Sequence, residues 1–82
     1  MPTADDFREF IIQTIHNNLC DQVELTSGDI HRALGGYPGR NHRMNTCCTV
    51  MYQLMAGDDK VIAAPPSGKG ATVTIRYFKH NH

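Results

Sequence analysis

The 82-residue sequence predicts one α+β domain with three helices, one short strand and a C-terminal two-strand β-hairpin. Apolar residues recur at helical spacing in residues 5–19 and in a segment that ends near residue 56. Apolar and polar residues alternate in residues 71–78, as in a half-buried strand. The chain has room for one modest core. We therefore place a single domain at residues 1–79 and expect residues 80–82 to form a loose tail.

The first helix is expected over residues 5–19. Its apolar face repeats at i, i+3, i+4 and i+8 and consists of Phe7, Phe10, Ile11, Ile15 and Leu19. The carboxylates of Asp5 and Asp6 lie in its first turn, where they favour the positive end of the helix dipole. Residues 23–25 are then expected to form a short extended segment.

Thr26 and Asp29 predict a capping box at the start of the second helix. Glycine accepts the left-handed backbone that ends many helices, so this helix is expected to end at Gly35. Its expected buried residues are Ile30, Ala33 and Leu34, and its expected exposed residues are His31 and Arg32.

The third helix is expected to begin at Asn41 or Asn45 and to end near Ala56. Its apolar stripe consists of Cys47, Val50, Met51, Leu54 and Met55. Strands are predicted at residues 60–64 and 71–78, and the segment between them contains Lys69 among prolines and glycines, which form turns readily. The expected core residues are Phe10, Ile11, Ile30, Leu34, Val50, Leu54, Val73 and Ile75.

Charge is distributed unevenly along the chain, although the formal net charge is zero. Residues 1–29 contain six acidic side chains and one basic side chain, Arg8. Residues 30–82 contain seven basic side chains and two acidic ones, Asp58 and Asp59. This asymmetry predicts a face for an acidic partner in the second part of the chain.

The order helix, short strand, helix, turn, helix and hairpin resembles that of the winged helix-turn-helix DNA-binding superfamily. The segments GGYPGRNHRM and SGKGATVTIRY are also similar to those of small uncharacterised bacterial proteins of this type. The resemblance implies that residues 41–53 enter the major groove of double-stranded DNA and that residues 65–72 form the wing. Transcription regulation is the role we associate with such a fold, and the resemblance leaves open whether the chain serves transcription or defence.

The residues themselves support a nucleic-acid surface. The approach to the third helix contains arginine, asparagine and histidine without an acid, and a helix N-terminus offers free N–H groups to phosphates. Arginine recognises guanine and asparagine recognises adenine through paired hydrogen bonds, whereas lysine contacts phosphates. The candidate nucleic-acid-binding residues are Arg32, Arg40, Asn41, His42, Arg43, Asn45, Thr46, Lys69 and Arg76. Alternatively, Asn41 or Asn45 merely caps the third helix.

Metal binding and catalysis are less well supported. His31, His42, Cys47 and Cys48 lack the paired spacing of common zinc sites, and two adjacent helical cysteines point about 100° apart, so one is expected in the core and one at its edge. A nuclease needs acidic ligands for its metal near His42, and none lies nearby. We expect no enzyme activity and no cofactor.

A protein-binding adaptor with the same fold, acting as a homodimer or through another partner, is the alternative function. Tyr37, Tyr52 and Phe78 would form its contact patch if they were exposed together. No apolar run is long enough to cross a membrane, and the N-terminus lacks the features of a secretory signal. The odd number of cysteines favours a reduced compartment, so we expect a cytoplasmic protein.

Overall fold

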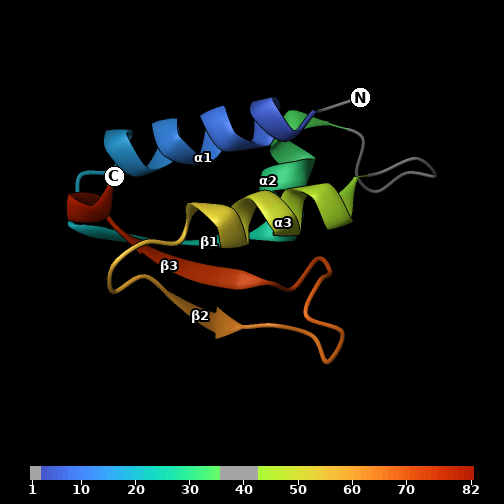
Figure 1. The fold of residues 1–82 in the computed structure, drawn as a ribbon. Coiled ribbons are helices and arrows are strands. Elements are labelled where there is room, and N and C mark those ends of the chain that lie inside the picture. The colour runs from blue at the N-terminus through green and yellow to red at the C-terminus, as the bar shows by residue number, and fades with distance from the viewer. Residues whose placement is uncertain (1–2, 36–42) are drawn as a thin grey trace.

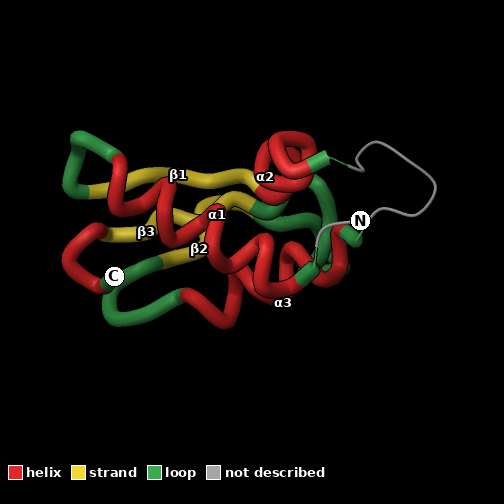
Figure 2. Tube along the Cα trace, turned by 90° about the horizontal axis from the view of Figure 1, so that it is seen from above, coloured by secondary structure: helices red, strands yellow, loops and turns green. Residues whose placement is uncertain are grey.

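A computed structural model of the chain describes residues 3–35 and 43–82. The elements are α1 (Ala4–Asn17), β1 (Gln22–Thr26), α2 (Ser27–Leu34), α3 (Met44–Leu54), β2 (Lys60–Ala63), β3 (Thr74–Phe78) and the short 3-10 helix η1 (Lys79–Asn81). The three α-helices lie over one face of the sheet (Figures 1 and 2). The predicted α+β class is confirmed. Within the described residues, no helix has both the length and the apolar character that a membrane span requires.

The sheet has three antiparallel strands in the order β1-β3-β2, rather than the two-strand hairpin expected. The short extended segment predicted at residues 23–25 is a full strand, and β1 pairs with β3 from Gln22↔Phe78 to Thr26↔Thr74. Ile75 and Tyr77 of β3 are buried beneath the helices, so Arg76 between them faces the other side of the sheet.

Helix α1 begins earlier and ends earlier than predicted. Thr3 and Asp6 form a capping box in which the Thr3 N–H donates to Asp6 Oδ2 (2.8 Å) and the Asp6 N–H donates to Thr3 Oγ1 (3.3 Å). Phe7, Ile11 and Ile15 are buried as expected. Leu19 was expected on the same face, but it lies beyond the end of the helix and is fully exposed.

Three predictions for α2, at Thr26, Ala33 and His31, were wrong. Thr26 is the N-cap residue but makes no side-chain cap hydrogen bond, because its Oγ1 lies 3.0 Å from Thr74 Oγ1 on β3. Ala33 is exposed, whereas Ser27, Ile30 and His31 are buried. The predicted end of the helix is confirmed, with Gly35 at φ 93°.

The core forms where α1 and α3 pack over the sheet. The buried apolar residues are Phe7, Ile11, Ile15, Ile30, Met44, Cys47, Cys48, Val50, Met51, Val73, Ile75 and Tyr77. Of the core residues predicted from the sequence, Phe10, Leu34 and Leu54 are only partly buried at its margin. The tyrosine hydroxyl in the core is satisfied, because Tyr77 Oη donates to the Met51 carbonyl (2.8 Å).

Residues 80–82 were expected to be loose, but they contact the turn between α3 and β2. Asp59 is the centre of this contact. Its carboxylate accepts hydrogen bonds from the Asn81 side chain (2.8 Å), the Phe78 N–H (2.7 Å) and the Ala56 N–H (3.1 Å), and it lies 2.7 Å from His82 Nε2. The buried carboxylate thus fastens the end of β3 and η1 to the end of α3.

Candidate functional site

The outward face of α3 is polar and contains no acidic side chain. Residues 43–57 include a single charged residue, Arg43. Asn45, Thr46, Thr49 and Gln53 line an open hollow of about 370 Å³ between α3 and α1, together with Ala4, Arg8 and Val50. Of these polar residues Thr46 is half-buried, and Asn45 is exposed. This face presents hydrogen-bonding groups without negative charge.

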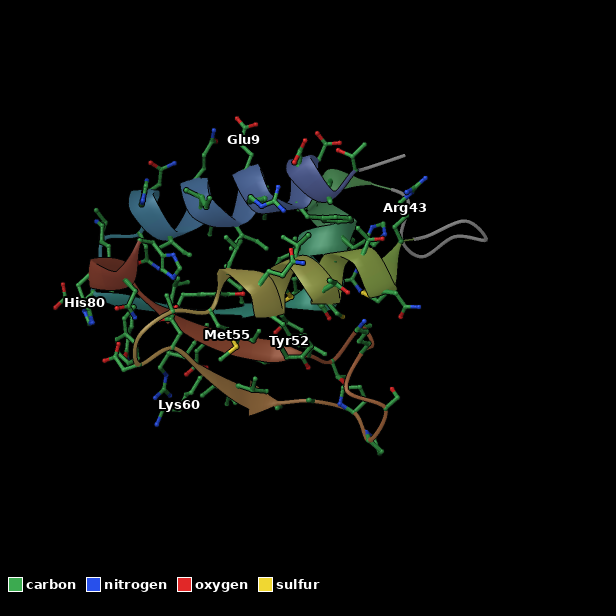
Figure 3. All side chains as sticks on the ribbon, viewed as in Figure 1. Glu9, Arg43, Tyr52, Met55, Lys60 and His80 are labelled. Carbon is green, nitrogen blue, oxygen red and sulfur yellow. The ribbon has the colours of Figure 1, made fainter. Side chains whose placement is uncertain are left out.

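Arg43 is the N-cap residue of α3, and its side chain makes no cap hydrogen bond. It is exposed and points outward at the end of α3 that lies near α2 (Figure 3). Asn45 lies inside the first turn, so the alternative in which Asn45 caps the helix is wrong. Its carbonyl accepts a hydrogen bond from Thr49 Oγ1 (2.8 Å). Arg40, Asn41 and His42, the neighbouring candidates, lie outside the described residues.

Lys69 lies on the segment between β2 and β3, and this segment extends toward the end of the molecule where α3 begins (Figure 1). A tight turn places it there, because the Gly68 N–H donates to the Pro65 carbonyl (2.9 Å). Tyr52 Oη on α3 donates to the Gly68 carbonyl (2.5 Å), so the loop lies beside this helix. The Lys69 side chain is exposed, and it has no ion pair or hydrogen bond with the residues that the structure describes.

Two further candidates are already paired with acids. Arg76 donates to Glu24 through Nη2 (2.6 Å) and Nε (3.0 Å) on the face of the sheet away from the helices. Arg32 Nη1 lies 3.0 Å from the Asp29 carboxylate on the exposed side of α2. Arg43, Asn45 and Thr46 thus lie at the start of α3, and Lys69 lies on the loop that contacts the same helix through Tyr52. Arg76 lies elsewhere, on the outer face of the sheet.

His31 was expected to be exposed, but it is fully buried between α2 and the start of α3. The Arg43 N–H donates to its Nε2 (2.7 Å), which leaves the ring proton on Nδ1, 3.1 Å from the Gly35 carbonyl. The ring also packs edge-on against Phe7, with 5.1 Å between centroids. His31 thus links Gly35 to Arg43, the two described residues on either side of residues 36–42.

We expect His31→Ala to lower the free energy of unfolding by about 2–3 kcal/mol, because it opens a cavity beside Phe7 and removes two hydrogen bonds. Chemical denaturation measures the loss. His80→Ala is the matched control, because His80 is exposed and its pair with Asp58 lies at the surface. Equal stability of the two variants would contradict the structural role of His31.

The two adjacent cysteines are both buried, although one was expected at the edge of the core. Burial, together with the neighbouring Cys48, raises the pKa of Cys47 to about 12, so its thiol is neutral at pH 7 and is a poor nucleophile. Cys48 Sγ contacts the Gly70 backbone. In residues 3–35 and 43–82, no cluster of three histidine, cysteine or acidic side chains has the arrangement of a metal site.

The described part of the site thus combines an acid-free helix face with Arg43 at its start and Lys69 on a loop beside it. Polar groups and cations in this arrangement can form hydrogen bonds and ion pairs with an anionic ligand. No protein-family model, curated protein or solved structure matches the chain.

Proposed function

We propose that the chain is a winged helix-turn-helix domain that binds double-stranded DNA, with α3 as the reading helix and the β2–β3 loop as the wing. The observation that supports this most is the acid-free outward face of α3, flanked by Arg43 and Lys69. The order α1-β1-α2-α3-β2-β3, in which the hairpin follows the third helix and β1 completes the sheet, agrees with it. The proposed function of the chain is binding, without a catalytic step.

The side chains have different roles in this proposal. Arg43 and Asn45 lie at the start of α3 and have the functional groups that discriminate guanine and adenine in the major groove. Lys69 neutralises a phosphate without reading sequence. Arg32 and Arg76 contribute less, because Asp29 and Glu24 already offset their charge.

Lys69→Ala is expected to weaken binding to any duplex and to lower the slope of log affinity against log salt by about one. Lys60→Ala removes the same charge but is expected to leave affinity unchanged. Lys60 is exposed at the start of β2, far from Arg43 (Figure 3). Titration of a mixed-sequence duplex at about 50 mM and about 200 mM salt measures both effects. Equal losses from the two substitutions would mean that binding depends on net charge and not on this face.

A protein-binding function is the second candidate, and the edge strand β2 favours it. All four residues of β2 are exposed, including Val61 (39%) and Ile62 (42%), and an uncovered edge can pair with a strand of another chain. The predicted aromatic patch is not supported by the described residues. Tyr52 lies on α3, whereas Phe78 shares the outer face of the sheet with Arg76. Tyr37, the third aromatic residue, lies outside the described residues. A folded protein that binds no duplex at low salt but sediments as a dimer would favour this second function.

A further inference from the structure

The base of the β2–β3 loop is fastened to the start of α2. The Ser27 N–H donates to the Val73 carbonyl (2.8 Å), and the Gly28 N–H donates to the Ala71 carbonyl (3.0 Å). Ser27 Oγ also donates to the Gly70 carbonyl. Ser27 and Gly28 are both buried, so these bonds form part of the domain interior. Residues 70–73 are therefore held independently of any ligand.

The side of the loop that faces α3 is held by two side chains of that helix. Cys48 Sγ lies 3.2 Å from the Gly70 carbonyl and 3.3 Å from the Gly70 nitrogen, so it fixes the residue after Lys69. Tyr52 Oη donates to the carbonyl of Gly68, the residue before Lys69. Cys48 and Tyr52 are four residues apart and therefore lie on the same side of α3. Lys69 thus lies between two backbone groups that α3 holds.

The tip of the β2–β3 loop, formed by Gly68 and Lys69, depends on Tyr52 more than the base of the loop, residues 70–73, does. Gly70 has contacts from Cys48 and Ser27, whereas Gly68 is linked to a helix through Tyr52 alone within the described residues. Gly68 has a positive φ of 82°, and a side chain at this position would meet nothing within 4 Å, so packing around it does not hold it in place. Without the tyrosine hydroxyl, the residue before Lys69 is restrained by local turn bonds only.

We infer that Tyr52 is a positioning residue for nucleic-acid binding, which holds Lys69 beside α3 so that both contact the same duplex. This inference rests on the proposed function. A lysine on a tip that is already ordered contributes its charge without the entropy cost of ordering the loop on binding. When the tip is released, the same ammonium group samples many positions, and fewer of them lie near a phosphate.

A double-mutant cycle with Tyr52→Phe and Lys69→Ala tests the inference, because a cycle measures whether two side chains act together. Tyr52→Phe keeps the ring and removes only the hydroxyl. The four proteins are titrated with one mixed-sequence duplex over a range of salt concentrations. Thr14→Val is the control, because it removes a hydroxyl that bonds to a helix carbonyl, that of Phe10 (2.7 Å), away from the loop.

Lys69→Ala in the wild-type background is expected to cost about tenfold in affinity at low salt and to lower the salt slope by about one. Tyr52→Phe is expected to lower affinity and slope in the same direction, and Lys69→Ala is expected to have little further effect in that background. Thr14→Val should change neither quantity. A full effect of Lys69→Ala in the Tyr52→Phe background would overturn the role of Tyr52 while leaving the proposed function intact.

Failure of the proposed function gives a different result, in which the wild-type protein shows no salt-dependent binding or Lys69→Ala does not change affinity.

Amide hydrogen exchange of the free protein supplies a measurement that needs no DNA. The exchange of the Gly68 amide, which donates to the Pro65 carbonyl, should accelerate in Tyr52→Phe and stay unchanged in Thr14→Val. Unchanged exchange in a folded Tyr52→Phe variant would show that the hydroxyl does not hold the tip.

Discussion

Reversal of two charges, in the variant Arg43→Glu with Lys69→Glu, is expected to lower affinity for duplex DNA at least about a hundredfold at low salt. Each substitution removes a cation that has no partner among the described residues and places a carboxylate against the phosphates. Both side chains are exposed, and Arg43 makes no side-chain cap hydrogen bond at the N-cap of α3. A carboxylate at the start of a helix also favours the positive end of the helix dipole, so we expect little loss of stability. Equilibrium titration should therefore report a loss of binding in a protein that is still folded.

The control for this variant carries the same change in net charge at the other end of the molecule. Lys60→Glu with Lys79→Glu alters two exposed lysines that lie away from the start of α3. If general attraction to the polyanion were responsible, both variants would lose affinity equally. A loss confined to the first variant supports a defined surface that includes α3 and the loop. Unchanged affinity in the first variant would contradict the nucleic-acid proposal.

Asp59→Ala is expected to lower the free energy of unfolding by about 3–5 kcal/mol, which is enough to unfold much of a small domain. The carboxylate side chain is fully buried and has the four partners already described, from three different parts of the chain. Its removal leaves the Phe78 and Ala56 N–H groups without their acceptor. Thermal or urea denaturation, with exposed Asp58→Ala as the control, measures the difference between the two aspartates.

Because of this carboxylate, we expect the free energy of unfolding to fall in acid. Burial alone raises the pKa of Asp59, but hydrogen bonds from Phe78, His82, Asn81 and Ala56 outweigh it, so the pKa in the folded state lies below the usual value. A group with a lowered pKa stabilises the fold above its unfolded pKa, about 4, and this contribution is lost as pH falls through the folded pKa. Asp59→Asn should remove this part of the pH dependence. An acid transition that is unchanged in Asp59→Asn would assign the effect to Asp58, whose pKa is also lowered.

The periodic features of the sequence predicted the elements well. The helical spacing placed α1 within two residues of each end, and the alternation in residues 71–78 located β3. The third helix begins at Met44, between the two starting points considered. These features are local, so a short window of sequence contains the information that specifies them. The failure at Leu19 has the same origin, because periodicity does not show where a helix ends.

Features that depend on distant partners were not predictable in the same way. The environment of His31 is set by Phe7 and by the backbone of Arg43, and that of Asp59 by residues at the end of β3 and in η1. One local signal for His31 was available, because Ser27, Ile30, His31 and Leu34 follow helical spacing on one face. For Asp59 no pattern indicated burial, because two aspartates after a glycine usually form an exposed turn.

The sheet order has a consequence for how the domain acquires its structure. The central strand, β3, lies furthest along the chain, and Thr26 of β1 meets Thr74, which is 48 positions further along the chain. Until residues 73–78 leave the ribosome, β1 and β2 have no strand between them, and Val73, Ile75 and Tyr77 are missing from the core. Closing so long a loop before its contacts form slows folding. We therefore expect the helices to gain stable structure only after β3 has been synthesised, and the domain to fold in one cooperative step.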